Sequence, residues 1–306
     1  MLIRQGNLPF IFKGHFFMEI LNSADWRSKA KSHSDKVLPW VEEFRFRRAR
    51  DQVHPVVDFL FTYYSFRPGQ LIRWSPGIGF ALKGSDLKAQ LGKFWKRDQG
   101  LASLDLSLMG ERQKRITFWI CELMKSISSR SAVYRCYGLH EWAMVYRLPT
   151  SELRHSQFPL RLSPEEINNF LDQQRICCSH YDAVRFFSPL ARPKNISNPT
   201  FSSRMAHEQS GCLHTNMDLY KWAYKMSPWI PSEIISDAFL LAAKIRDLDM
   251  RASPYDLTSL GCEPVRIETV EGRNEYQRIQ RIFSDEAGPI REKLLEAIER
   301  VISHIN

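Results

Sequence analysis

The sequence predicts a predominantly α-helical α+β protein, folded as a single compact domain with a small central β element. A chain of 306 residues, with 43% hydrophobic and 25% charged side chains, is long enough to bury a large core. Apolar residues recur at three- and four-residue steps over long stretches, which is typical of helices that bury one face. β-type residues gather mainly in two short stretches, 158–162 and 176–187. Without an internal repeat or a linker, residues 18–306 are expected to form one globular unit.

Two helical regions are indicated in the first half of the chain. Asn22-Ser23 offers side chains that cap a helix, and Pro39 is expected to break that helix into two pieces. Residues 106–127 form an amphipathic helical pattern with apolar side chains at Leu108, Ile116, Trp119, Ile120, Leu123 and Ile127.

The second half is expected to contain a short helix and three longer ones. Ser163-Pro164-Glu165-Glu166 is typical of a helix start. Residues 134–147 fit either a helix or a strand, and residues 189–199 fit a loop. The longer helices are expected at 217–226, 232–248 and 273–303, the last interrupted at Gly288-Pro289.

The first seventeen residues are expected to be a disordered or loosely docked extension. They resemble a signal peptide, but Lys13 and His15 interrupt the apolar run before it reaches the ~7–15 residues that a signal core needs. No stretch reaches the ~20 apolar residues of a membrane span, so no membrane partner is expected. Six cysteines, two of them adjacent at Cys177-Cys178, favour a reduced, cytoplasmic protein.

The net charge of +9 is unevenly distributed. Residues 27–50 contain eight Lys and Arg against three acids, whereas residues 263–306 contain seven against nine. A basic helix of this kind would contact a phosphate backbone, with DNA as the partner and Arg45, Arg47, Arg48 and Arg50 as the contacts. The alternative is a solvated helix face, which charge runs commonly form.

Two Cys-x-His triplets suggest a metal site as an alternative to a metal-free protein. Cys178 and His180, like Cys212 and His214, would point to one side if each triplet lay on a strand. Together they would supply the four ligands of a zinc site, or of an iron site. The other interpretation is that the cysteines fill space and the histidines satisfy local hydrogen bonds.

Acids in aromatic surroundings are the candidate catalytic residues. His140-Glu141 precedes a tryptophan, Asp182 follows a tyrosine, and Asp218 precedes Tyr220 and Trp222. Hydrolysis of an N-glycosidic bond needs carboxylates to stabilise positive charge and to activate water. The structural alternative for each acid is an ion pair with a neighbouring arginine, or a helix cap.

Residues 247–256 place several polar groups where a helix is expected to end before Pro254. Asp249 and Tyr255 are candidate substrate contacts, and Arg251 would clamp a phosphate or carboxylate. Arg251 would equally pair with Asp247, four residues earlier on the same helix.

Four segments carry a resemblance to a known family: HEWAMVYR (140–147), CSHYDAVRFFSPLARP (178–193), CLHTNMDLYKWAYKMSP (212–228) and IRDLDMRASPYDL (245–257). Together with residues 54–74 they are similar to a bacterial, notably actinobacterial, family labelled 3-methyladenine DNA glycosylase, over about residues 18–287.

The resemblance implies an enzyme that flips an alkylated purine out of DNA and cleaves its glycosidic bond with water. In this interpretation the water-activating acid is one of Glu141, Asp182 and Asp218, with His140 beside them. Arg251 and the basic helix would hold phosphates. The remaining candidates for substrate binding are His180, Tyr181, His214, Asn216, Tyr220 and Trp222.

Other motifs narrow the alternatives. Ser75-Pro76-Gly77-Ile78-Gly79 is similar to the hairpin of helix-hairpin-helix glycosylases, but no helix and no suitably spaced Asp follow it, so it is interpreted as a chance turn. The sequence contains no P-loop, no strand-linked GxGxxG, no HExxH and no GxSxG. A small-metabolite enzyme with a metal held by Cys, His and Asp remains the second hypothesis, and a non-catalytic binding module the third.

Overall fold

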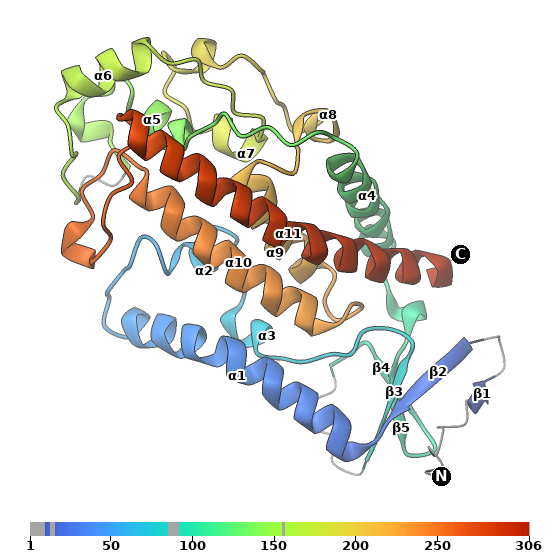
Figure 1. The fold of residues 1–306 in the computed structure, drawn as a ribbon. Coiled ribbons are helices and arrows are strands. Elements are labelled where there is room, and N and C mark those ends of the chain that lie inside the picture. The colour runs from blue at the N-terminus through green and yellow to red at the C-terminus, as the bar shows by residue number, and fades with distance from the viewer. Residues whose placement is uncertain (1–9, 13–15, 85–91, 155–156, 306) are drawn as a thin grey trace, which may run out of the picture.

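The computed structural model describes residues 10–12, 16–84, 92–154 and 157–305. The protein is a mostly helical single domain, with 56% of its residues in helices and 7% in strands. Figure 1 shows long helices stacked across the molecule and a small sheet at one end.

Five long helices form the body of the domain. They are α1 (Ser23–Arg48), α4 (Glu111–Ser128), α9 (Leu213–Lys225), α10 (Ser232–Arg251) and α11 (Val270–Ile305). Helix α10 packs against α9, α11 and α1, while α11 also packs against α9 and α4. Because α9 and α10 are covered by other helices, even their polar side chains are largely buried.

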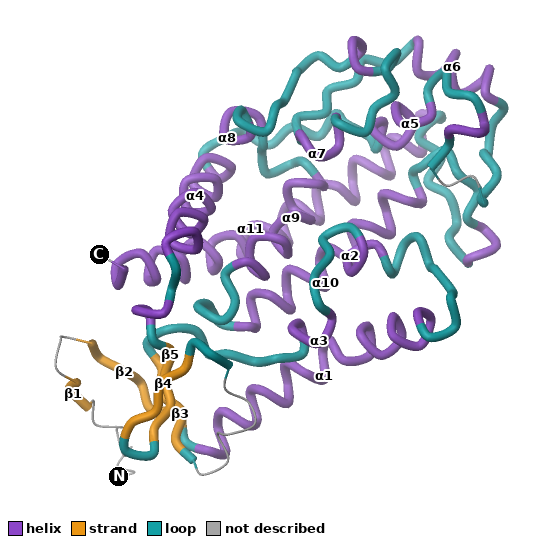
Figure 2. Tube along the Cα trace, turned by 180° about the vertical axis from the view of Figure 1, so that it is seen from behind, coloured by secondary structure: helices purple, strands orange, loops and turns teal. Residues whose placement is uncertain are grey.

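Short helices connect and cover the long ones. They are α2 (Phe59–Thr62), α3 (Pro68–Leu71), α5 (Leu139–Val145), α6 (Pro164–Asp172), α7 (Tyr181–Val184) and α8 (Arg204–His207), with 3₁₀ turns at η1 (Leu106–Leu108), η2 (Thr150–Glu152), η3 (Arg192–Lys194) and η4 (Thr258–Leu260). In both views α5, α6 and α7 gather at the end of the molecule opposite the sheet (Figures 1 and 2).

The sheet has the strand order β1-β2-β3-β5-β4. Its strands are β1 (Phe10–Phe12), β2 (Phe16–Leu21), β3 (Phe80–Lys83), β4 (Trp95–Asp98) and β5 (Leu101–Leu104). β2 and β3 are parallel, and the other pairs are antiparallel. Figure 2 shows this sheet next to the start of α1, and it is fastened there by a hydrogen bond from Trp26 Nε1 to the Lys83 carbonyl (3.1 Å).

The predicted class, a mainly helical single domain with a small β part, is confirmed. The expected helix starts are also confirmed. The Asn22 side chain accepts from the Asp25 amide, and Ser163 forms a capping box with Glu166. Residues 134–147, which fitted two structures, contain α5.

The predicted helix breaks are wrong, because α1 continues through Pro39 and α11 through Pro289. A proline inside a helix costs about 3 kcal/mol through a lost hydrogen bond and a steric clash. Val37 and Val41 flank Pro39 and are completely buried. Burial of both side chains offsets a cost of that size.

The strands predicted at 158–162 and 176–187 are also wrong. These stretches make single bridges only, Leu160 with Tyr255 and Ile176 with Asn195, and the second contains α7. Conversely, residues 10–12 and 16–17 of the predicted extension belong to β1 and β2, whereas residues 1–9 and 13–15 lie outside the described residues. Residues 10–12 pair antiparallel with residues 16–18, which the composition of this segment did not indicate.

Candidate metal centre

Charged and imidazole side chains from α5, α7, α8, α9, α10 and their flanks meet in one buried network. We call it the ionic cluster. It consists of His140, Glu141, His180, Asp182, Arg204, Glu208, His214, Asp218, Lys221, Arg246 and Asp249.

Helix geometry explains how these side chains come together. His214, Asp218 and Lys221 follow one another at four- and three-residue steps and therefore project from one side of α9. Arg246 and Asp249 are three residues apart and likewise project from one side of α10. Because α9 and α10 pack directly against each other, the two polar faces meet inside the domain.

One half of the cluster is centred on Asp249. Its Oδ1 lies 2.8 Å from Nε2 of His140, and its Oδ2 lies 3.1 Å from the Arg246 guanidinium. Arg246 also contacts Oε1 of Glu141 at 3.2 Å. The ring of His214 lies edge-on to that of His140, with the ring centres 4.3 Å apart. We call His140, His214 and Asp249 the first triad, because one donor atom from each gathers within 4.8 Å.

The other half is centred on Asp218. Nε2 of His180 lies 3.3 Å from Oδ2 of Asp218, and the Tyr64 hydroxyl donates to Oδ1 at 2.7 Å. Asp182 comes from α7 and pairs with Arg204, which also contacts Glu208 at 3.0 Å. Donor atoms of His180, Asp182 and Asp218 likewise lie within 4.8 Å of one another, and we call this set the second triad.

The cluster carries an excess of negative charge. Five carboxylates face three permanent cations, Arg204, Lys221 and Arg246, while Arg185 touches Asp182 only from the exposed surface. Burial raises the pKa of Glu208, but the pKa values of Asp218 and Asp249 are lowered because neighbouring cations outweigh the effect of burial. Asp218 and Asp249 are therefore ionised, and each lies beside an imidazole, His180 and His140 respectively.

The imidazoles of the first triad differ in charge. Burial lowers the pKa of His214 to about 3, helped by the adjacent His140, so this ring is neutral and keeps a free lone pair. Burial alone would also lower the pKa of His140, but Asp249 outweighs it and the pKa is raised. A metal ion between these rings would take the place of the proton that His140 shares with Asp249.

A cavity of about 10 Å³ adjoins His140 and His214. That is about the space of one water molecule. Its lining also includes Cys136, Cys178 and Cys212.

The alternative zinc or iron set of Cys178, His180, Cys212 and His214 does not gather as four ligands in the described part of the chain, where the metal-competent groups are the two triads. Burial raises the pKa of both thiols, that of Cys212 to about 12, which disfavours the thiolate that binds metal. The two His residues join different triads instead.

The predicted catalytic residues Asp218, Glu141, Asp182 and His140 are therefore brought together. Of the predicted rings, Tyr181 and Trp222 border the cluster, each with its ring centre 5.7 Å from the Arg204 guanidinium, but Tyr220 does not. Tyr220 is fully buried and packs edge-on against Phe239 at 5.2 Å. Trp222 packs against Trp119, and Tyr255 is buried in the core.

The other predicted contacts lie outside the cluster or have structural partners. Asn216 donates to the Ser210 carbonyl and accepts from Arg291. Arg251 binds the Glu263 carbonyl and Asp247, so the local alternative holds for it. Tyr181 is partly exposed and contacts Phe201 edge-on.

Of the four predicted DNA-contacting arginines, Arg45, Arg47 and Arg48 lie in the last turn of α1 and Arg50 follows its end, and none of them belongs to the ionic cluster. Arg47 is engaged by Asp58 at 2.6 Å, and Arg50 stacks on Phe46. Arg45 and Arg48 are exposed. The basic surface is consequently smaller than the sequence suggested.

The Pro-Gly-Ile-Gly turn packs against the protein rather than facing outward. The Ile78 amide donates to the Trp229 carbonyl (3.1 Å), and a Cβ on Gly77 would lie 2.9 Å from Pro231. Because its backbone is occupied, this turn is a structural element, in agreement with the interpretation as a chance match.

Arg204, Glu208 and Arg246 belong to the cluster although they were not among the sequence candidates. Two signals were present in the sequence. Arg204 and Glu208 are spaced by four residues, and Arg246 and Asp249 by three, which are the spacings of helical ion pairs. Neither spacing reveals that the pair is buried.

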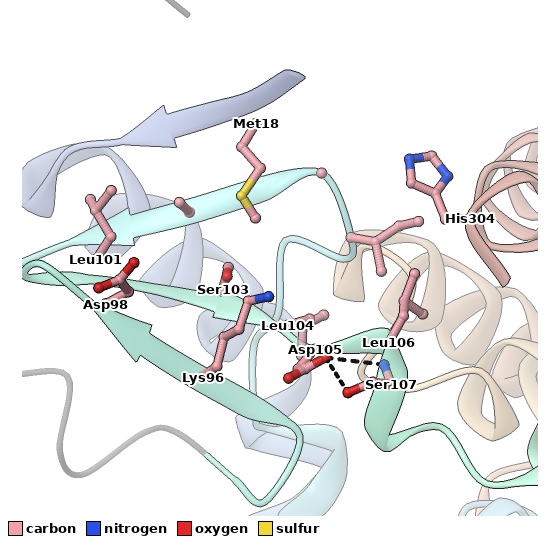
Figure 3. A pocket seen from close by; sticks show the side chains of 13 residues that line it. Met18, Lys96, Asp98, Leu101, Ser103, Leu104, Asp105, Leu106, Ser107 and His304 are labelled. Carbon is pink, nitrogen blue, oxygen red and sulfur yellow. Dashed lines mark hydrogen bonds between the residues drawn. The ribbon is translucent and has the colours of Figure 1, made fainter. Parts of the chain in front are cut away.

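Larger hollows lie elsewhere on the protein. Figure 3 shows one of about 460 Å³ over the sheet, lined by Met18 of β2, Lys96 and Asp98 of β4 and Ser103 of β5, with His304 on the facing side. The dashed lines in Figure 3 are hydrogen bonds from Ser107 to Asp105, which close a local turn. Neither triad contributes to this hollow.

No family model, curated protein or solved structure matched this chain. Among the described residues, no helix is both long and apolar enough to cross a bilayer.

Proposed function

We propose that this protein is a metal-dependent enzyme that hydrolyses a small-molecule substrate, with the ion bound by the first triad. The observation that supports this most strongly is the convergence of His140, His214 and Asp249 from three helices beside a water-sized cavity. Two imidazoles and one carboxylate suit Zn²⁺ and Fe²⁺, and they leave coordination positions open.

The charge of the cluster supports the same proposal. The five acids of the cluster outnumber Arg204, Lys221 and Arg246, so a bound cation would replace positive charge that otherwise depends on protons held by His140 and Glu208. When bound, such an ion supplies a water molecule of lowered pKa and polarises the bond to be cleaved.

The protein side chains have distinct roles in this proposal. Arg246 holds Asp249 and Glu141 together, 3.1 and 3.2 Å from its guanidinium nitrogen. Oε1 of Glu141 lies 3.9 Å from Nε2 of His140. At this distance Glu141 can accept a hydrogen bond from a water molecule beside the triad. Glu141 takes one proton from that water, the remaining hydroxide adds to the substrate, and the same proton then goes to the leaving group.

Access to the triad passes an irregular segment, residues 129–137. Val133 and Cys136 of this segment line the cavity, and Val133 is 45% exposed. Because the cavity holds only about one water molecule, substrate binding in this proposal needs a local opening of the segment, which hydrogen bonds between Val133 and Gln209 and from Arg130 to the Met205 and Glu208 carbonyls oppose.

The DNA glycosylase function rests on the family resemblance alone. A flipped purine needs a ring-lined pocket, and Tyr220, one of the rings predicted for it, is packed in the core. The cavity of about 10 Å³ beside the first triad holds neither a purine nor another substrate as it stands, so the preference for a metal-dependent enzyme rests on the donor set of the first triad.

Chelator treatment followed by ion add-back tests the proposal. The purified protein is assayed against phosphoesters, amides and N-glycosides, and hydrolysis should stop with the chelator and return with Zn²⁺ or Fe²⁺. His214→Ala should be inactive, while His207→Ala, which changes a histidine that bonds to the Ser203 carbonyl and belongs to neither triad, should be active. Glu141→Gln should retain the ion and lose about 10²–10⁴-fold in rate. Hydrolysis that is equally fast in chelator would refute the proposal.

A further inference from the structure

Lys221 lies between the acids of the second triad. Its Nζ is 2.9 Å from Oδ2 of Asp182 and 2.9 Å from Oδ2 of Asp218. His180 approaches Oδ2 of Asp218 from another direction at 3.3 Å. A cation bound by His180, Asp182 and Asp218 would contact the same two carboxylates as the ammonium group does.

His180 supplies an independent sign that this place suits a cation. Its side chain is completely buried, and neither ring nitrogen makes a well-directed hydrogen bond within the described residues. Nε2 lies near two carboxylates, Asp218 at 3.3 Å and Glu208 at 3.5 Å. Burying an imidazole whose nitrogens lack a directed hydrogen bond costs free energy. A metal ion bound to the ring would remove that cost, and imidazole is a common metal ligand in proteins.

The two triads are neighbours. The rings of His180 and His214 are 5.4 Å apart between centres. Two ions held by adjacent sets of this kind would form a paired centre, such as those with metals ~3.5–4 Å apart in hydrolytic enzymes.

We propose that Lys221 stands in the place of a second metal ion, so that the native protein holds one ion and gains a second when the ammonium group is removed. This inference rests on the proposed function only for the ion in the first triad. The second triad would bind its ion through its own three residues.

The placement of Lys221 explains why it excludes an ion. The residue is tethered to α9 one turn after Asp218, so it reaches both acids without losing translational freedom, which a free ion must lose. Arg204 contributes a second positive charge through Asp182. Together the two cations neutralise the pair of acids that a divalent ion would need.

The test uses Lys221→Met, which keeps most of the side-chain length and removes the charge. Lys225→Met, one turn further along α9 and exposed, is the matched control. Each full-length protein is freed of metal with a chelator and titrated calorimetrically with Zn²⁺, and bound zinc is counted by elemental analysis. A fold check by circular dichroism accompanies each variant, and Lys221→Gln replaces Lys221→Met if the latter does not fold.

We expect one zinc per chain in the native protein and in Lys225→Met, and two in Lys221→Met. The second equivalent should bind at least about tenfold more tightly in Lys221→Met than any second equivalent in the native protein. Adding Asp182→Asn to Lys221→Met should remove it again.

Two equivalents in the native protein, or a folded Lys221 variant that binds no more zinc than the native protein, would overturn the inference about Lys221. No zinc in the native protein with one in Lys221→Met would support this inference while refuting the proposed function. The two proposals therefore fail in different ways.

Discussion

His140 and Asp249 lie far apart in the sequence, yet Nε2 of the first is 2.8 Å from Oδ1 of the second. Both side chains are at least 97% buried. The contact joins α5 to α10 and sets the geometry of the first triad, because His214 packs edge-on against His140. Such a pair is expensive to bury unless it holds a proton or a cation between its members.

Removing the charge of Asp218 should destabilise the fold. Asp218→Asn removes one of the two carboxylates that Lys221 and His180 each contact, and breaking a buried ion pair costs about 3–5 kcal/mol. Asp237→Asn is the control, since Asp237 makes a surface pair with Lys36 worth at most about 1 kcal/mol. Urea denaturation of both variants measures the difference. Equal losses in the two variants would show that the network does not stabilise the fold.

Two buried tyrosines should respond differently to loss of the hydroxyl group. Tyr64 donates to Asp218 at 2.7 Å, so Tyr64→Phe should lose about 1.5–3 kcal/mol, the range for hydrogen bonds to charged groups. The Tyr220 hydroxyl has no hydrogen-bond partner in the described residues, so Tyr220→Phe should be neutral or slightly stabilising. Thermal and urea unfolding report both effects. If Tyr220→Phe were instead the more damaging change, Tyr220 would have a role other than core packing.

His33 should make the fold sensitive to mild acid. Its Nε2 donates to the Leu71 carbonyl at 2.8 Å, and burial lowers the pKa of the ring below its ordinary value of 6.5. The unfolded chain takes up a proton near pH 6.5 while the folded chain does not, so stability is full above that pH and falls as the pH drops below it.

The loss attributable to His33 is at most about 1.4 kcal/mol per pH unit. His33→Gln keeps a donor for the carbonyl and cannot titrate. Unfolding free energies measured between pH 5 and 7.5 should therefore slope less in this variant than in the native protein. Identical slopes would mean that His33 has the same pKa in both states.

The glycosylase prediction can be separated from the proposed function with methylated DNA. We expect no free 3-methyladenine to be released from alkylated duplex DNA, because Tyr220, one of the rings predicted to stack on the base, is packed against Phe239 in the core. Chromatography of the released bases gives the answer. Release that disappears in Asp218→Asn, at unchanged fold, would instead establish the activity implied by the family resemblance.

Part of the centre was predictable from the sequence. His140, His180, His214, Asp218 and Asp249 were all candidates, and the structure brings them into one cluster. The reason is that polar groups repeated at helical spacing inside apolar segments must face something other than water. Helix continuity through Pro39 was not predictable, because it depends on burial by partners that local sequence does not show.

The prediction that Tyr220 lines an aromatic pocket was wrong for a different physical reason. Tyr220 and Trp222 flank an acid in the sequence, which is equally typical of a stacking site and of a filled core. On α9 the ring of Tyr220 turns toward Phe239, while Asp218 turns toward Lys221. Arg204 and Glu208 were missed because they come from a short helix and its flank, where no longer pattern marks them as buried.

The most direct test of the proposed centre is the metal content of the purified full-length protein, measured by elemental analysis together with His214→Ala, Asp249→Asn and His207→Ala. The proposal predicts one tightly bound zinc or iron per native chain, the same in His207→Ala, and loss of the ion in the two triad variants while they stay folded. A native protein that retains no metal after incubation with either ion, or triad variants that retain it fully, would contradict the account.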